Sequence, residues 1–441
     1  MHAPALAVAP PPADPSVAAL LAARPHLSMH AHDGLMLEGV ALNAIADALG
    51  TPVWAYGAGT LRRRLAALQG ALAGLAGVHY AVKANDHLAV LRVLAAGGAG
   101  ADVVSGGELA RALRAGIAPS RIVFSGVGKT TEEIRAALAA GIAQINVESA
   151  AELDMISALA AELGRTVLVA LRVNPDVDAG THAKITTGLA ENKFGIPYDE
   201  AAALYARAAA LPFLRPVGLA LHIGSQIVTL APYRAAFARA ATLVRDLRAA
   251  GLVVSRLDCG GGLGIGYRDE PGASPDAFAG ALRAAFGAMD VELMVEPGRW
   301  LVGPAGVLLA SVLLTKADGR IAVLDAAMTE LVRPAMYEAW HAVVPLSPVR
   351  ATEPVAPVDL VGPVCETADT FARARMLPPL RAGDRVALLD AGAYGAVMSS
   401  TYNARPLAPI ALIDGARWAT VRPRQAIEEL WRQESVPDFL D

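Results

Sequence analysis

The chain has 441 residues, of which 54% are hydrophobic and 18% charged, and its formal net charge at pH 7 is −4. This composition is that of a globular protein large enough for two domains, and it gives no electrostatic reason to expect nucleic acid or an anionic membrane as a partner. Two cysteines, Cys259 and Cys365, are too few for a disulfide framework, so a reducing, cytoplasmic location is expected.

The N-terminal stretch 1–24 is rich in Ala and Pro at its start and is expected to be a disordered extension. It lacks the basic start and the unbroken apolar run of a secretory signal. Residues 25–58 hold short strand-like pieces and a helix near Ala41 to Leu49. The longest apolar run, Trp300 to Thr315, is interrupted by glycine and proline and is too short to span a bilayer, so no membrane association is expected.

From Thr60, a plausible N-cap, an amphipathic helix is predicted to run to about Ala76, and a regular alternation of apolar strands and helices follows. Strands are predicted at 78–82, 101–104, 121–124, 142–147, 166–173, 216–222, 252–258 and 291–296. Helices are predicted at 87–96, 107–115, 131–140, 150–163, 199–210, 231–250 and 275–288. The alternation indicates a parallel sheet covered on both faces, and the count of eight strands favours a closed (β/α)₈ barrel over an open doubly wound sheet. The barrel is expected over residues 59–300.

After residue 300 the pattern changes to short β-rich runs punctuated by proline and glycine, which is typical of an antiparallel β domain. The runs lie at 306–314, 320–325, 341–345, 385–390, 409–413 and 417–421. This C-terminal β domain is expected to span 301–441, with the N-terminal segment 25–58 completing it. The Pro-rich stretch 345–357 is expected to be a surface loop within it.

Polar side chains and glycines gather at the C-terminal ends of the predicted barrel strands, where barrel enzymes build their active sites. They are Lys83, Ser105, Ser125, Glu148, Asn174, His222, the Cys259–Gly262 run and Glu296. Burial of Lys83 would lower its pKa and free an amine that can form a Schiff base with a carbonyl. The simpler alternative is a lysine that reaches the surface from a strand end.

Three more features of this rim indicate a cofactor. Gly260, Gly261 and Gly262 could cradle a phosphate with backbone N–H groups, although a tight turn or a dinucleotide loop would also use glycines. Glu296 could keep a ring nitrogen protonated while Arg299 binds a carboxylate; a surface ion pair between the two is the alternative.

His222 could lie flat on a ring or serve the structure alone. A lysine, a phosphate cradle, a carboxylate and a flat imidazole together point to pyridoxal phosphate. No Cys/His/Asp cluster has metal-ligand spacing, so no metal is expected.

From about Asp33 to Leu440 the chain resembles the fold-type III (alanine-racemase-like) pyridoxal-phosphate enzymes, and within them the diaminopimelate decarboxylases. The resemblance rests on Tyr80–Asn85, Gly100–Leu109, Asn174–His182, Asn192–Gly195, His222–Gln226, Gly260–Gly262, Glu296–Arg299, Arg333–Tyr337, Gly362–Glu366 and Gly392–Tyr394. The chain departs from the pattern in its Pro-rich N-terminal extension and at Val127-Gly128.

The resemblance implies a role for each matching residue. Lys83 would form the Schiff base, His222 would stack on the ring and Glu296 would pair with its nitrogen. Further cofactor contacts would come from Ser225, Gly260, Gly261, Gly262, Pro297, Gly298, Arg299 and Tyr394. The substrate would be held by Arg299, Arg333, Tyr337, Glu366 and Tyr394. Cys365, as proton donor, and Glu366 would reach into the partner's site in a homodimer with shared active sites.

The implied reaction is decarboxylation of meso-2,6-diaminopimelate to L-lysine and CO₂, the last step of lysine biosynthesis. A decarboxylase of ornithine, arginine or carboxynorspermidine would share the cofactor site but would want an acid where Arg299 and Arg333 stand. A racemase would need a second acid/base facing the lysine. A non-catalytic binding protein would be expected to lose the lysine or the phosphate cradle, and both are present.

Overall fold

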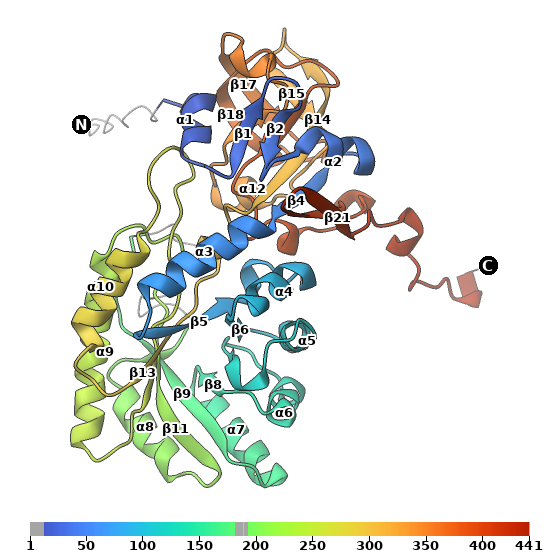
Figure 1. Ribbon diagram of the computed structural model, residues 1–441. Coiled ribbons are helices and arrows are strands. Elements are labelled where there is room, and N and C mark those ends of the chain that lie inside the picture. The colour runs from blue at the N-terminus through green and yellow to red at the C-terminus, as the bar shows by residue number, and fades with distance from the viewer. Residues whose placement is uncertain (1–12, 181–187, 189–192, 441) are drawn as a thin grey trace, which may run out of the picture.

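The computed structural model describes residues 13–180, 188 and 193–440, which form a barrel and a β domain joined by helix α3 (Ala58–Ala71) (Figure 1). In the view of Figure 1 the barrel lies at the bottom and the β domain at the top. The sequence motifs that include Thr181, His182 and Asn192 fall partly outside the described residues.

The barrel is a closed ring of parallel strands, because β8 pairs with β9 and completes the order β9-β11-β12-β13-β5-β6-β7-β8. Its strands are β5 (Ala76–Ala81), β6 (Gly100–Val103), β7 (Ile122–Phe124), β8 (Gln144–Val147), β9 (Val167–Asn174), β11 (Leu214–Ala220), β12 (Arg256–Asp258) and β13 (Glu292–Val295). The two-residue strand β10 (Ile196–Pro197) adds to β9 outside the ring. The prediction of an eight-stranded (β/α)₈ barrel is confirmed, since each predicted strand matches one of these.

Helices cover the outside of the barrel, as its apolar strands require (Figure 1). They are α4 (Leu88–Ala96), α5 (Gly106–Arg114), α6 (Thr131–Ala140), α7 (Ala150–Leu163), α8 (Ala201–Ala210), α9 (Ala231–Ala249) and α10 (Pro275–Phe286), followed by the short α11 (Arg299–Val302). Local sequence sets several of their ends. Thr130 and Glu133 form a capping box at the start of α6, and Gly141 ends it with a left-handed backbone conformation.

Helix α3 begins earlier than predicted, and a distant residue caps it. Thr60 lies in the first turn and is not the N-cap, which is Gly57. Glu38 supplies the missing acceptor: its carboxylate accepts from the Gly59 backbone at 3.0 Å and also from the Thr60 backbone and hydroxyl. A carboxylate at a helix N-terminus is stabilised by the free N–H groups there, so this contact replaces the local cap that the sequence indicated.

The β domain is a mixed sheet in which the N-terminal strand β4 (Val53–Gly57) lies between β14 and β20, so the N-terminal segment completes it. Its other strands are β14 (Gly306–Lys316), β15 (Ile321–Leu324), β16 (Val343–Pro345), β17 (Ala356–Val361), β18 (Thr370–Leu377), β19 (Arg385–Leu388), β20 (Ile410–Asp414) and β21 (Arg417–Arg422). Most pairs are antiparallel as predicted, but β4–β20 and β15–β17 are parallel.

Strands β17 and β18 were not predicted. β17 begins inside the Pro-rich stretch 345–357 with the exposed Ala356 and Pro357, and β18 has Arg373 and Ala374 exposed side by side, so neither strand shows a regular apolar alternation. The short helix α12 (Arg333–Tyr337) packs against β18 and carries two of the expected substrate contacts.

The stretch expected to be disordered, 1–24, needs a correction. Residues 1–12 lie outside the described part of the chain, but α1 (Val17–Ala22) is helical with Ser16 as its N-cap. After α1 a small sheet of β1 (Leu27–His30), β2 (Gly34–Leu37) and β3 (Val40–Ala41) precedes α2 (Leu42–Leu49). A search of the described residues finds no helix with the length and apolarity needed to cross a membrane.

Candidate active site

Lys83 lies in a single 3₁₀ turn, Val82–Ala84, immediately after β5. Its Nζ donates to Asp102 Oδ2 on the neighbouring strand β6 at 2.8 Å. Desolvation in the barrel mouth acts to lower the lysine pKa, but the charges of Asp102 and Glu296 outweigh it and raise that pKa above its usual value. The expectation of a lowered pKa is therefore wrong, because it took no account of the two carboxylates.

Lys83 lines a cavity of about 390 Å³ at the C-terminal mouth of the barrel. The cavity walls are Lys83, Val104, Ser125, Gly126, Val127, Gly128, Asn146, Arg172, Phe194, Ala220, Leu221, His222 and Glu296. A small adjoining pocket shares Lys83, His222 and Glu296 and adds Ala81, Ser225, Gly262, Leu263, Gly298, Arg299 and Tyr394. This volume lies within the usual range for small-molecule sites. The structure thus brings together the lysine, imidazole and carboxylate that the sequence indicated.

Glu296 is buried against a second carboxylate, Asp258, at the end of β12. Asn146 Nδ2 and the Gly260 backbone N–H donate to Asp258 at 2.9 and 3.0 Å, and both bonds favour its ionised form. Burial, and then the charges of Asp102 and Asp258, raise the pKa of Glu296 well above its usual value. Although burial also raises the pKa of Asp258, its two donors place the shared proton on Glu296.

A protonated Glu296 is suited to share its proton with a ring nitrogen. Glu296 also accepts from Ser125 Oγ at 3.4 Å. The alternative of a surface ion pair with Arg299 is wrong, because both residues are buried and Arg299 bonds to other groups.

His222 follows β11 and forms one wall of the cavity. Its Nδ1 accepts from the Gly261 backbone N–H at 3.3 Å. Burial, and then the charges of Lys83 and Arg172, lower the imidazole pKa well below its usual value. The ring is therefore neutral with its proton on Nε2, which suits contact with a flat ring.

The glycine run after β12 is packed too tightly for side chains. A Cβ on Gly260 would lie 2.1 Å from the Leu221 carbonyl oxygen, and one on Gly261 would lie 2.0 Å from that of Glu296. Gly262 has a φ of +97°, which only glycine adopts without strain. Its N–H donates to no group among the residues that the structure describes. The run is thus fixed by the close approach of two strand ends, and it leaves an amide at the small pocket.

The buried Arg299 lines this pocket, and Tyr267 connects it to a second buried arginine, Arg333. Arg299 Nη1 donates to the Tyr267 hydroxyl at 2.7 Å, and its Nη2 donates to Ser225 Oγ at 3.1 Å. The Arg333 guanidinium lies 4.9 Å from the Tyr267 ring centroid, and its Nη1 bonds His341 Nε2 at 2.7 Å. No carboxylate in the described part of the chain pairs with either arginine. Buried guanidinium groups without a counter-charge indicate a site for an anion.

His341 must be neutral to accept the hydrogen bond from Arg333, and its other hydrogen bond determines its tautomer. Its Nδ1 donates to the Leu389 carbonyl oxygen at 2.8 Å, which leaves Nε2 as the acceptor. Burial, and then the charge of Arg333, lower the His341 pKa well below its usual value. Tyr394, another expected contact, lies with its ring centroid 4.8 Å from the Arg299 guanidinium.

Some expected residues lie elsewhere. Cys365 and Glu366 occupy an exposed loop of the β domain and line neither pocket of the Lys83 site. Glu366 accepts from the exposed Tyr402 hydroxyl at 2.7 Å. Ser105 caps α5, so this rim residue has a structural role.

Other expected residues also bond to the local framework. The Pro297 carbonyl accepts from Ala81 N at 3.2 Å, Asn174 Oδ1 accepts from Asp176 N at 2.9 Å, and Glu148 pairs with Arg172 at 2.7 Å. Tyr337 is the last residue of α12.

The sequence interpretation missed Asp102, Asn146, Asp258, Tyr267 and His341. The first three are polar residues near the ends of apolar barrel strands, and that position was a usable signal. Tyr267 and His341 lie in irregular segments, and their relation to the arginines depends on contacts between distant parts of the chain.

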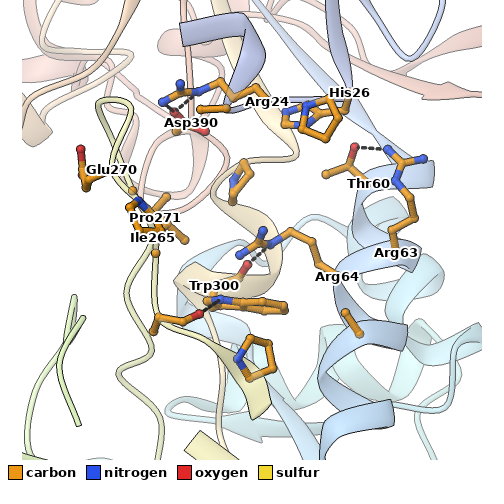
Figure 2. Close-up of a pocket in the computed structure, with 18 of the residues that line it drawn as sticks. Arg24, His26, Thr60, Arg63, Arg64, Ile265, Glu270, Pro271, Trp300 and Asp390 are labelled. Atoms are coloured by element: carbon orange, nitrogen blue, oxygen red, sulfur yellow. Dashed lines mark hydrogen bonds and ion pairs between the residues drawn. The ribbon is translucent and has the colours of Figure 1, made fainter. Parts of the chain in front are cut away.

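A larger cavity of about 750 Å³ lies between residues 23–26, helix α3 and the loop 265–276 (Figure 2). Figure 2 shows Arg24 facing Asp390 and Arg64 lying over Trp300. The distance from Arg24 Nε to Asp390 Oδ2 is 2.8 Å, and the Arg64 guanidinium lies 3.8 Å from the Trp300 ring centroid. These cations are already engaged, and neither Lys83 nor any expected cofactor contact lines the cavity. We therefore place the active site in the smaller cavity at the barrel mouth. Among the described residues no group of three or more His, Cys, Asp or Glu could hold a metal, and the expected absence of a metal stays a prediction.

Comparisons with known proteins agree with this site. Residues 58–303 match the pyridoxal-dependent decarboxylase family, pyridoxal binding domain. Diaminopimelate decarboxylase of Zymomonas mobilis is 45% identical over 92% of this chain and 98% of its own, and that of Pseudomonas aeruginosa is 48% identical over 91% and 97%. The crystal structure of diaminopimelate decarboxylase from Helicobacter pylori complexed with L-lysine is 39% identical, with a TM-score of 0.86 over 89% of this chain and 98% of that one.

The fold, the site and these matches define a class: a fold-type III, pyridoxal-phosphate-dependent carboxy-lyase. The residues around the cavity fit the cofactor, because a lysine, a neutral imidazole and a buried carboxyl line it, and Gly262 of the glycine run lines the adjoining small pocket. Within this class the chain belongs to the diaminopimelate decarboxylase family.

Proposed function

We propose that the Lys83 site decarboxylates meso-2,6-diaminopimelate to L-lysine, with Arg299 and Arg333 binding the carboxylate at the end of the substrate that does not react. The observation that carries this proposal is the buried arginine pair without a carboxylate partner, of which Arg299 lines the small pocket that Lys83 also lines, and Tyr267 connects Arg333 to it. A substrate with an amine and no carboxylate at that end would leave both guanidinium groups unpaired.

Pyridoxal phosphate, when bound, accepts the electron pair of the broken bond between Cα and its carboxylate. The residues of the chain would divide the remaining tasks. Lys83 would hold the cofactor through its Nζ. His222 would face the cofactor ring, and Glu296 would share a proton with the ring nitrogen. Gly262, Ser225 and Tyr394 line the small pocket that would take the phosphate, and Gly260 and Gly261 precede Gly262 in the glycine run.

A proton must return to Cα after CO₂ leaves, and Cys365 is proposed to supply it from a second subunit. This rests on the resemblance and on the exposed position of Cys365, away from the Lys83 cavity of its own chain. Glu366, beside it, would bind the distal amine, and Tyr337 would join the arginines at the distal carboxylate. The active protein is then a homodimer with two shared sites. The two unpaired cysteines support a cytoplasmic enzyme.

The experiment that tests the function measures CO₂ and L-lysine from meso-diaminopimelate with purified protein loaded with pyridoxal phosphate. One CO₂ should be released for each L-lysine formed, and Lys83→Ala should form neither. Borohydride should attach the cofactor to the peptide that contains Lys83. Exchange of the Cα proton without CO₂ release would instead favour a racemase.

The shared site has its own test. Lys83→Ala and Cys365→Ala should each be inactive alone. After subunit exchange, mixing them should restore up to about a quarter of wild-type activity, since half of the dimers are mixed and each has one intact site. No recovery after demonstrated exchange would place each site within one chain.

A further inference from the structure

Residues 426–440, here called the C-terminal arm, carry large apolar side chains into solvent. Figure 1 shows the arm leaving the β domain after β21 and projecting away from the rest of the molecule. The exposed fractions are 57% for Ile427, 51% for Trp431, 74% for Val436, 84% for Phe439 and 66% for Leu440. A cluster of this kind on one segment indicates a surface that another molecule covers.

The arm is anchored only at its start. Arg424 Nη2 donates to the Pro52 carbonyl oxygen at 3.0 Å, and Gln425 N donates to that of Leu407 at 3.1 Å. Beyond them, within the described range 426–440, every hydrogen bond and ion pair joins two residues of the arm itself: Ala426 with Glu429, Trp431 with Glu434, Pro437 with Leu440, and Arg432 with Glu429. The arm therefore has local turns, but its own chain does not cover its apolar side chains.

The charge of the arm narrows the choice of partner. The arm has a net charge of −3, from the four acids Glu428, Glu429, Glu434 and Asp438 and the single base Arg432. An anionic membrane surface would repel such a segment. The chain itself offers complementary charge: Arg92 on α4 and Arg114 on α5 are exposed on the barrel.

The exposed apolar area of the arm is also large enough for self-association. The exposed parts of the five apolar side chains amount to roughly 600 Å², taking 150–250 Å² for a whole aromatic side chain and somewhat less for an aliphatic one. Two arms in a twofold dimer would bury on the order of 1,200 Å² before the surfaces that they cover are counted, which is enough for a stable interface.

We propose that the C-terminal arm docks on a second copy of this chain and holds the dimer together. The inference rests on the proposed function in one respect, because the shared site already requires a second copy. A twofold-symmetric dimer covers the apolar side chains of both arms, because each subunit contributes one arm and binds the arm of the other. The proposal assigns to Trp431 and Phe439 a task at the interface that is separate from substrate and cofactor binding.

The test is the double variant Trp431→Glu, Phe439→Glu of the full chain, measured by sedimentation velocity across protein concentration. Val253→Glu is the matched control. Val253 is likewise an exposed apolar residue, with 69% of its surface accessible, but it precedes β12 at the N-terminal end of the barrel strands and is not part of the arm. Wild type and control should be dimers. The double variant should have a dimer dissociation constant at least tenfold higher, with an unchanged circular dichroism spectrum.

Hydrogen exchange gives the second measurement, because amides of the arm should be protected in the dimer and lose that protection on dilution to monomer. Equal dimerisation of wild type and the double variant, or an unprotected arm in the dimer, would overturn the proposal. A monomeric wild type would also overturn it. CO₂ release from meso-diaminopimelate is measured on the same samples. Release by the wild type would show that the proposed function holds even where the docking proposal fails.

Discussion

The Nη1 atom of Arg299 lies 2.7 Å from the hydroxyl oxygen of Tyr267, and the ring of the same tyrosine lies against Arg333. One side chain therefore positions both of the arginines that are proposed to bind the distal carboxylate, by a hydrogen bond on one side and by a cation–π contact on the other. Tyr267 is a positioning residue in this account.

Tyr267→Phe removes the hydroxyl and keeps the ring. We expect the KM for diaminopimelate to rise about tenfold, because a hydrogen bond to a charged group contributes roughly 1.5–3 kcal/mol, while kcat changes little. Cofactor affinity, followed by visible absorption, should stay the same. Tyr267→Leu should have a larger effect, since it also removes the contact with Arg333. Equal kinetics for wild type and both variants would show that the arginines hold their positions without Tyr267.

Asp102→Asn should lower the pKa of Lys83, because it removes the carboxylate that lies 2.8 Å from Nζ. A neighbouring opposite charge shifts a pKa by about 1–3 units. The rate at which cofactor-free enzyme takes up pyridoxal phosphate should therefore reach its plateau at a pH lower by about that amount. Stopped-flow absorption across pH measures this rate. Glu292→Gln, at the other end of the barrel, is the control and should keep the wild-type profile. A profile for Asp102→Asn that matches the control would contradict the assigned ion pair.

Glu108 predicts a pH dependence of stability. Burial is the main cause that raises its pKa to about 7, while the Val104 N–H, which donates to it at 2.8 Å, acts in the opposite direction. Below pH ~4.3 the carboxyl is protonated in both the folded and the unfolded chain. As the pH rises to about 7 only the unfolded chain ionises, so the free energy of unfolding falls across this window and levels off above it.

Glu108→Gln keeps the acceptor for Val104 and cannot ionise. Relative to wild type, the variant should gain on the order of 1–2 kcal/mol in free energy of unfolding between pH 4.5 and pH 8. Urea unfolding at the two pH values measures the difference. A stability difference that does not change with pH would show that Glu108 ionises normally in the folded protein.

The barrel and the main cofactor residues could be predicted from the sequence because their signals are local. Apolar strands ended by Lys83, His222 and Glu296 fix both the strand count and the rim on which these residues lie. What could not be predicted depends on contacts between distant segments. Glu38 caps α3 from another element, and Asp102 reverses the expected pKa shift of Lys83 from the next strand.

The β domain was harder to predict for a related reason. β17 and β18 pair with each other at the edge of the sheet, and their pairing shifts register on both sides of Leu360, so the period-2 alternation of buried and exposed residues is interrupted. The parallel pairing of β4 with β20 joins segments more than 350 residues apart, and no local pattern carries that information.

The variant Arg333→Met tests the second arginine of the pair. Arg333 lines neither pocket of the Lys83 site, so cofactor binding should be unchanged. The kcat/KM for diaminopimelate should fall by at least two orders of magnitude, because the distal carboxylate loses a charged partner in a buried site. Arg333→Lys, which keeps the charge but not the planar fork, should recover only part of the loss. A variant with near-normal kcat/KM would remove Arg333 from the substrate site.

The most direct test of the central claim is the ratio of kcat/KM values of the wild-type enzyme for meso-diaminopimelate and for D-ornithine, D-arginine and D-lysine. L-Lysine keeps the L centre of meso-diaminopimelate, so the centre that loses CO₂ is D, and these three compounds share that D amino-acid group and lack the distal carboxylate. If the unpaired arginines select for that carboxylate, diaminopimelate should be preferred by roughly four orders of magnitude or more. Comparable turnover of any of the three would contradict the account, even with the cofactor bound at Lys83.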